Sequence, residues 1–197
     1  MRAVLAIAIV VLLAGCGTVT SEYEPSNVVD APPPGGSGLI VFSTGAPSRC
    51  VHLATYLELR PEGGSGREKP LARAGVDSYI VKSDFEDHQG NLHVMPVPAG
   101  RYYLAPWTDN PLVRQVTQPK AVFSVEAGES VYLGEFYMRQ GCGFEQRYEV
   151  NDQITRDLAL LKSKASRIDP SKITKRLMEL SGGLPACDAT NNALSCR

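Results

Sequence analysis

The residues best suited to chemistry lie in one polar stretch near the middle of the chain. It contains two carboxylates and two imidazoles, from Asp84, Asp87, His88 and His93. Proteins use carboxylates to bind calcium and imidazoles to bind zinc. Their spacing matches neither the His-Glu-x-x-His motif nor a calcium-binding loop. Gln89-Gly90-Asn91 is instead typical of a hairpin turn, which would place the acids at a solvated tip. These four residues are weak metal candidates, and the sequence predicts no bound metal or other cofactor.

Other signatures of catalysis are missing from the sequence. The glycine-rich stretch 63–69 lacks the Gly-Lys-Ser/Thr ending of a phosphate-binding loop. No Gly-x-Ser-x-Gly motif marks a nucleophilic serine, and His52 falls on the polar face of a predicted strand, as surface histidines do. The sequence therefore predicts a protein that is not an enzyme. A metal-dependent hydrolase built on the four residues above is the least favoured alternative.

The most informative segment of the sequence is the one that ends at Cys16. It ends the motif Leu13-Ala14-Gly15-Cys16, which follows a positive amino end, Met1-Arg2, and an apolar run over 3–12. This arrangement resembles the processing signal of bacterial lipoproteins. The resemblance implies cleavage between Gly15 and Cys16. It also implies a thioether-linked diacylglycerol on the Cys16 sulfur and a further acyl chain, such as palmitate, on its new amino group.

A transmembrane helix is the alternative explanation of this segment. A bilayer needs about 20 apolar residues, whereas 3–14 supplies twelve before the sequence turns small and polar. An ordinary cleaved signal or a retained anchor are further alternatives. Three acyl chains would hold the protein on a membrane permanently. Because Gly17 and Thr18, directly after Cys16, include no aspartate, the resemblance implies the periplasmic leaflet of the outer membrane in a Gram-negative cell, and the cell membrane otherwise.

The remaining cysteines favour an exported, oxidised protein. The chain has five cysteines, and the four beyond Cys16 are an even number in a compartment that permits disulfides. Three pairings are possible. We favour the disulfides Cys187–Cys196 and Cys50–Cys142. A metal site is disfavoured because no Cys-x-x-Cys spacing occurs.

Charge gives no sign of a nucleic-acid partner. The chain carries 20 basic and 21 acidic side chains, and removal of residues 1–15 takes away only Arg2. The mature protein would then have a formal charge near −2, too small and of the wrong sign to attract nucleic acid.

The chain divides by composition into five parts. We expect a signal peptide (1–15), a lipidated flexible linker rich in proline and glycine (16–38), a β-domain (39–150), a helical pair packed on it (151–182) and a disulfide-closed tail (183–197). Alternating apolar residues separated by turn residues predict strands in the β-domain. These strands are expected over 39–43, 51–59, 78–83, 91–97, 101–107, 121–126, 130–138 and 144–150, with a bulge at Gly134.

Two turns in this region carry a second resemblance. They are Val97-Pro98-Ala99-Gly100-Arg101-Tyr102-Tyr103-Leu104 and the hairpin around Ala127-Gly128, which leads into Val131-Tyr132-Leu133-Gly134. Together they resemble the prealbumin-like (transthyretin-type) domains of carboxypeptidases and of uncharacterised envelope lipoproteins. The resemblance covers about 40 residues and implies an antiparallel, prealbumin-like or Ig-like β-sandwich that binds or scaffolds.

Apolar spacing changes to a helical period after Val150. Ile154, Leu158 and Leu161 form one stripe of a first helix over 152–165. A second helix is expected from the cap Asp169-Pro170 to Gly182, with its stripe at Ile173, Leu177 and Leu180. The pair is expected to cap the sandwich, with a docking face for a partner as the alternative. Six bases between Lys162 and Arg176 could touch anionic lipid or cell wall, but a solvated helix face explains them as well.

The sequence thus predicts a lipid-anchored, non-catalytic binding or assembly module of the cell envelope. Its expected partners are the membrane, through Cys16, and an envelope protein or the cell wall. The alternative is a periplasmic ligand or inhibitor module that binds cell-wall fragments or a hydrolase.

Overall fold

The chain folds mainly into β-strands. The computed structural model describes residues 28–49, 55–64, 69–78, 81–108, 119–139 and 147–181. Its elements in chain order are β1 (Ser37–Gly45), β2 (Thr55–Pro61), β3 (Ala72–Gly75), β4 (Leu92–Pro98), β5 (Gly100–Thr108), β6 (Lys120–Val125), β7 (Ser130–Met138), β8 (Tyr148–Asn151), the helix α1 (Ile154–Lys164), a 3₁₀ turn (Pro170–Lys172), β9 (Thr174–Lys175) and β10 (Glu179–Ser181). The expected mainly β class is confirmed.

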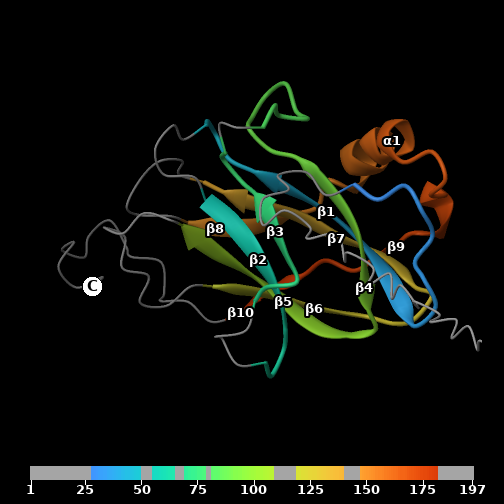
Figure 1. Cartoon of the computed structure of the whole chain (residues 1–197). Coiled ribbons are helices and arrows are strands. Elements are labelled where there is room, and N and C mark those ends of the chain that lie inside the picture. The colour runs from blue at the N-terminus through green and yellow to red at the C-terminus, as the bar shows by residue number, and fades with distance from the viewer. Residues whose placement is uncertain are drawn as a thin grey trace, which may run out of the picture.

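The strands form two sheets of five (Figure 1). The first sheet has the order β4-β1-β7-β8, with β9 also paired to β7, and the second has the order β10-β6-β5-β2-β3. Pairing is mostly antiparallel, as expected. However, β1 and β9 run parallel to β7, so the first sheet is mixed. Parallel pairing needs a long connection, and the chain between β1 and β7 supplies it by building most of the second sheet.

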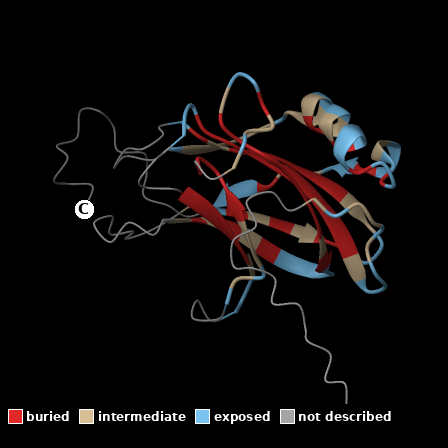
Figure 2. Ribbon diagram, turned by 45° about the horizontal axis from the view of Figure 1, so that its top comes forward, coloured by how far each residue is buried: buried red, intermediate tan, exposed pale blue. Residues whose placement is uncertain are grey.

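Two apolar clusters hold these layers together. One contains residues from both sheets, including Ile40, Phe42, Leu57 and Leu104. The other joins the opposite face of the first sheet to α1 through residues such as Leu39, Val41 and Leu161. The first sheet is therefore buried on both faces (Figure 2). This explains why the centre of β1 reads as a continuous apolar run instead of an alternating one.

Gly134 produces the expected bulge in β7. Val41 pairs with Tyr132 but Ser43 pairs with Glu135, so β7 has one extra residue at this point. Gly134 adopts a left-handed φ of +95°, which glycine tolerates best. Because a one-residue shift reverses the facing of every later side chain, Glu135 lies on the α1 side of the sheet. Phe136 and Met138 face the core between the sheets, as Leu133 does.

One predicted strand is misplaced. Residues 81–83, at the end of the strand expected over 78–83, belong to no strand. Instead β3 lies a few residues earlier, in the sequence Ala72-Arg73-Ala74-Gly75. Small residues have low strand propensity, so this segment gives little signal. It pairs along β2 because Ala72 and Ala74 fit against the core.

The second predicted helix is wrong, and with it the expected helical pair. Asp169 does cap a turn at Pro170, accepting a hydrogen bond from the Ser171 backbone N–H at 3.0 Å, but the turn ends at Lys172. The chain then runs extended beside β7, whose carbonyl groups accept the N–H groups of Arg176 and Met178. It finishes as β10 on the edge of the second sheet. Pairing with open sheet edges thus outweighs helical spacing.

The end of the expected linker packs on the domain. Val28 bridges Val94 of β4, and the Val29 backbone N–H donates to the Val94 carbonyl at 3.0 Å. Asp30 accepts the Arg167 backbone N–H at 2.7 Å. The domain therefore begins about ten residues before the boundary expected at residue 38.

The bulge predicts a difference between two glycine substitutions. A Cβ at Gly134 would lie 3.0 Å from Val150 and 3.1 Å from both Asn151 and Leu177, whereas one at Gly128, also left-handed, would meet nothing within 4 Å. Gly128→Ala should cost about 1 kcal/mol of unfolding free energy through backbone strain. Gly134→Ala should cost at least about 2 kcal/mol because crowding adds to strain. Denaturant unfolding measures both, and equal losses would contradict the role given to crowding.

Candidate functional site

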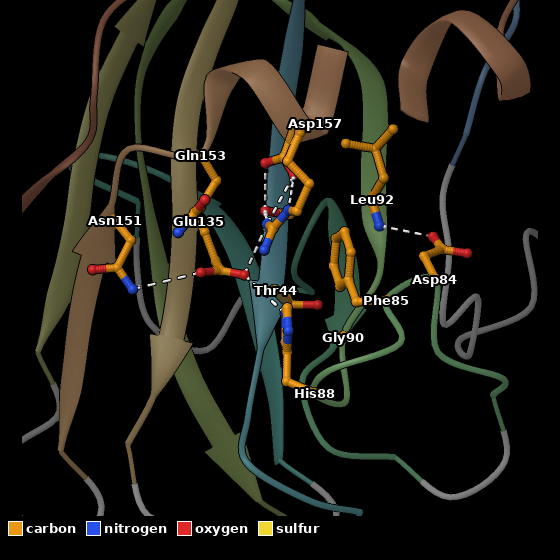
Figure 3. Close-up of polar contacts among 12 residues, drawn as sticks. Thr44, Asp84, Phe85, His88, Gly90, Leu92, Glu135, Asn151, Gln153 and Asp157 are labelled. Carbon is orange, nitrogen blue, oxygen red and sulfur yellow. Dashed lines mark hydrogen bonds and ion pairs between the residues drawn. The ribbon is translucent and has the colours of Figure 1, made fainter. Parts of the chain in front are cut away.

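A connected group of polar side chains lies where α1 covers the first sheet (Figure 3). We call it the Asp157 network. Its members come from β1, the 81–91 loop, β7 and α1, and they are Ser43, Asp87, His88, Tyr132, Glu135, Arg156 and Asp157.

Asp157 is the centre of this network and has no exposure to solvent. One oxygen, Oδ2, accepts the hydroxyls of Ser43 at 2.6 Å and Tyr132 at 2.8 Å. The other, Oδ1, accepts the Arg156 Nε–H at 2.9 Å. Burial of the Tyr132 hydroxyl, together with the Asp157 charge, raises the pKa of Tyr132 well above its ordinary value. The buried carboxylate is thus fully satisfied, as buried charges must be.

Tyr132 also fixes the start of the helix. Gln153, the residue before α1, makes no capping bond with its side chain. Instead its backbone N–H donates to the Tyr132 hydroxyl at 3.1 Å. One side chain of β7 therefore binds both the first-turn carboxylate and the amino end of the helix, where the free N–H groups need acceptors.

Arg156 connects Asp157 to a second buried carboxylate, Glu135. Its Nη2 lies 2.9 Å from Glu135 Oε1, and its guanidinium lies 3.9 Å from the centre of the Phe85 ring. Burial works to raise the pKa of Glu135, but the hydrogen bond from His88 and the charge and hydrogen bond of Arg156 outweigh it and hold that pKa below its ordinary value. Glu135 is therefore a carboxylate at neutral pH.

His88 places the 81–91 loop against this carboxylate. Its Nε2 lies 3.1 Å from Glu135 Oε1 and its Nδ1 lies 2.7 Å from Asp87 Oδ1. The ring also stacks on Phe85 at 4.6 Å. Burial works to lower the pKa of His88, but the bonds to Glu135 and Asp87 prevail and raise it above 6.5. Only the protonated imidazole can donate to both carboxylates at once.

The prediction that Gln89-Gly90-Asn91 forms a solvated hairpin tip is wrong. Gln89, Gly90 and Asn91 are buried, and a Cβ on Gly90 would lie 2.0 Å from the Thr44 carbonyl oxygen. The Ser83 hydroxyl lies 2.8 Å from the His88 carbonyl and accepts the Gly90 N–H at 3.1 Å. The loop therefore folds back over the end of β1, and of the two aspartates that it carries only Asp87 projects into solvent.

The four metal candidates do not share one site. Asp84 accepts the Leu92 N–H at 2.9 Å and pairs with Lys164 at 2.5 Å. His93 faces the core between the sheets, stacked on Phe42 at 4.9 Å with its Nε2 3.2 Å from the Thr44 hydroxyl. Burial lowers the pKa of His93 to about 3. Within the part of the chain that the structure describes, no group of three or more His, Cys, Asp or Glu side chains could hold a metal ion.

The arrangement suits a clamp better than a reaction centre. The Ser43 hydroxyl donates a hydrogen bond to Asp157 and accepts one from Arg156, whereas a nucleophilic serine hydrogen-bonds to a general base such as an imidazole. Each carboxylate of the network is paired with protein donors, and Ser43, Glu135 and Asp157 are buried. What the network does is join a helix, a loop and two strands.

Sequence reasoning missed most of these residues, although a signal was present. Asp157 lies within the apolar stripe formed by Ile154, Leu158 and Leu161, where a charged side chain must find a buried partner. Glu135 follows the glycine that reverses the facing of β7. Neither residue belongs to a known motif, so only the fold brings them together.

Several predicted sites lie outside the described residues. These are Cys16 with its cleavage site at Gly15, His52, the centre of the 63–69 stretch, and Cys50, Cys142, Cys187 and Cys196. The basic run is described, and four of its six residues pair with acids: Lys164 with Asp84, Arg167 with Asp30, Lys175 with Asp152 and Arg176 with Glu129. None of the helices in the described ranges is long and apolar enough to cross a membrane.

The comparisons with known proteins do not place the chain in a family. No protein-family model matches the chain, and no curated protein is similar to it.

Removal of the central charge should test the clamp. Asp157→Asn should lower the unfolding free energy by about 1 to 3 kcal/mol, because the buried hydroxyls of Ser43 and Tyr132 lose a charged acceptor and the half-buried Arg156 keeps only Glu135 as a carboxylate partner. Asp152→Asn is the matched control, since Asp152 pairs with Lys175 near the surface, and its loss should be far smaller. Denaturant unfolding compares the two. Similar losses of unfolding free energy in the two variants would show that the Asp157 network adds no more stability than a surface ion pair.

Histidine titration should separate His88 from His93. The folded pKa of His88 is raised, so its contribution to stability is complete below the unfolded value of about 6.5 and is lost as pH rises through the folded pKa. NMR of the imidazole protons should place the pKa of His88 above 6.5, while His93 stays neutral down to about pH 3. The stability difference between wild type and His88→Gln should shrink as pH rises above neutrality. A normal or lowered His88 pKa would disprove the bridge between the two carboxylates.

Proposed function

We propose that the chain is a lipid-anchored, non-catalytic module of the bacterial cell envelope that binds or helps to assemble other envelope components. The observation that carries this proposal is the motif Leu13-Ala14-Gly15-Cys16 after a short apolar segment. Cys16 carries the acyl chains, and the domain faces the periplasm from the outer membrane of a Gram-negative cell. Disulfides Cys50–Cys142 and Cys187–Cys196 belong to the same proposal.

The fold supports a scaffolding or binding role. Two sheets share one apolar core, which is compatible with the prealbumin-like β-sandwich that we propose for this domain. The polar groups best suited to catalysis are engaged with each other in the Asp157 network. A rigid body of this kind can present a surface to a partner without itself changing shape.

The attachment of Val28 limits how far the domain can stand from the membrane. Cys16 precedes Val28 by twelve residues, and even a fully extended chain of that length spans only about 40 Å. The Val28 end of the domain therefore stays within about 40 Å of the membrane surface, which favours a partner near that surface. An envelope protein or the cell wall meets this condition.

Replacement of Cys16 tests the anchor. Full-length protein made in a Gram-negative host should be cleaved before Cys16, carry fatty acids by mass spectrometry and fractionate with the outer membrane. Cys16→Ser should lose the lipid and the membrane association. Cys196→Ser, a control at another cysteine, should keep both. An intact, unmodified Met1 in the wild-type protein would overturn the proposal.

A further inference from the structure

The first described residues of the chain cross one edge of the first sheet. Residues 28–36, which we call the strap, begin beside β4 and end in the turn that leads into β1 (Figure 1). Val28 bridges Val94 as a parallel neighbour, and the Val29 N–H donates to the Val94 carbonyl at 3.0 Å. Because Cys16 precedes these residues, the proposed lipid anchor is joined to the domain through the strap.

Prolines prevent the strap from pairing further along β4. If the parallel pairing continued toward β1, Asp30 would lie beside Pro96 and Pro32 beside Pro98. Three of these four residues are prolines, and a proline has no N–H to donate to a ladder. The bridge at Val28 therefore cannot grow into a strand in this direction, and the strap is held mainly near its ends.

A surface ion pair provides the second contact of the strap. Asp30 Oδ1 accepts the Arg167 backbone N–H at 2.7 Å, and Asp30 Oδ2 lies 3.5 Å from Arg167 Nε. The Asp30 and Arg167 side chains are 32% and 69% exposed, so water and salt weaken the attraction between their charges. Val28 packs half-buried against the cluster under α1, but Val29 is exposed. Among the residues that the structure describes, the strap thus has far fewer backbone partners than a strand with neighbours on both sides, such as β1.

Such a segment can leave the domain without unfolding it. Docking must offset the conformational freedom that the strap loses, and segments with few buried contacts open locally while the core stays folded. Release would end at the turn before β1, because the Gly36 carbonyl accepts the Ala99 N–H at 3.1 Å and the Ser37 carbonyl accepts the Gly128 N–H at 2.8 Å. The three prolines at 32–34 favour an extended conformation, so the released strap would act as a stiff spacer.

We propose that the strap detaches reversibly from β4 and the turn after α1, and that its docking sets how far the domain stands from the membrane. While the strap is docked, the limit of about 40 Å between Cys16 and Val28 applies. Once it is released, the chain from Cys16 to Ser37, the first residue of β1, is free. Ser37 follows Cys16 by 21 residues, and a fully extended chain of that length spans about 70 Å. The effect on reach rests on the proposed lipid anchor, whereas the release itself does not.

Cleavage of the Val28–Val29 bond by thermolysin, which cuts before apolar residues, tests the release. When opening is fast, the cleavage rate follows the population of the open form. We define protection as the rate for a bond in a free peptide divided by its rate in purified full-length protein in neutral detergent, both followed by mass spectrometry. The peptide for this bond is 24–36. Wild-type protection should exceed one, yet be at least about tenfold lower than that of the Leu39–Ile40 bond in β1, which opens only with the domain.

Substitutions at the ion pair should increase the release. Asp30→Ala should lower the protection of the Val28–Val29 bond about fivefold, measured against a peptide with the same substitution. Arg167→Gln leaves the cleaved sequence and the backbone N–H unchanged and should lower it about twofold. Asp152→Ala is the matched control, since Asp152 pairs with Lys175 and not with the strap, and it should leave the protection unchanged. Wild-type protection as high as in β1, or no greater than one, would overturn the proposal.

The reach is measured on the lipidated protein in a supported bilayer by neutron reflectometry. Asp30→Ala should increase the mean distance between the domain and the bilayer by about 10 to 30 Å, and Asp152→Ala should not change it. An unchanged distance in Asp30→Ala would overturn the link between the strap and reach. Cys16→Ser protein should show the same protection of the Val28–Val29 bond as wild type, so a failure of the anchor and a failure of the release are distinguishable.

Discussion

Asp157 places a carboxylate in a layer of apolar side chains, with no contact to solvent. An unpaired charge in that position would cost several kcal/mol. The fold avoids this cost by bringing Ser43 from β1, Tyr132 from β7 and Arg156 from the helix itself to its two oxygens. These partners fix the rotation and position of α1 more narrowly than apolar packing does, because hydrogen bonds are directional. The helix, in turn, covers the outer side of the first sheet.

The bulge at Gly134 makes the second half of this arrangement possible. Without the extra residue, Glu135 would face the apolar core between the sheets, beside Leu133 and Val131. With it, Glu135 faces Arg156 and His88, and the 81–91 loop gains a charged contact with β7. Gly45 contributes from the neighbouring strand, since a Cβ there would lie 2.9 Å from the Glu135 carboxylate. Two glycines thus shape the space that the charged groups occupy.

The structural elements that depend on short-range interactions could be predicted from the sequence. Strands with large alternating residues, the bulge at Gly134, the helix α1 and the cap at Asp169 all follow from local rules. The misses have long-range causes. β3 is built from small residues and depends on β2, and the 174–181 segment becomes extended because open edges of both sheets accept it. The Asp157 network joins residues up to 114 positions apart, so its charged members could be noticed in the sequence but not connected.

The order of the strands also has a consequence for how the chain acquires its structure. β1 finds its partners only when β4 and β7 are present, and both sheets receive their last strands from 174–181, close to the end of the described chain. A chain synthesised from its amino end therefore cannot complete either sheet until residues 174–181 have emerged. Contacts between such distant segments make folding slow, and the unpaired strands exposed meanwhile are prone to aggregate.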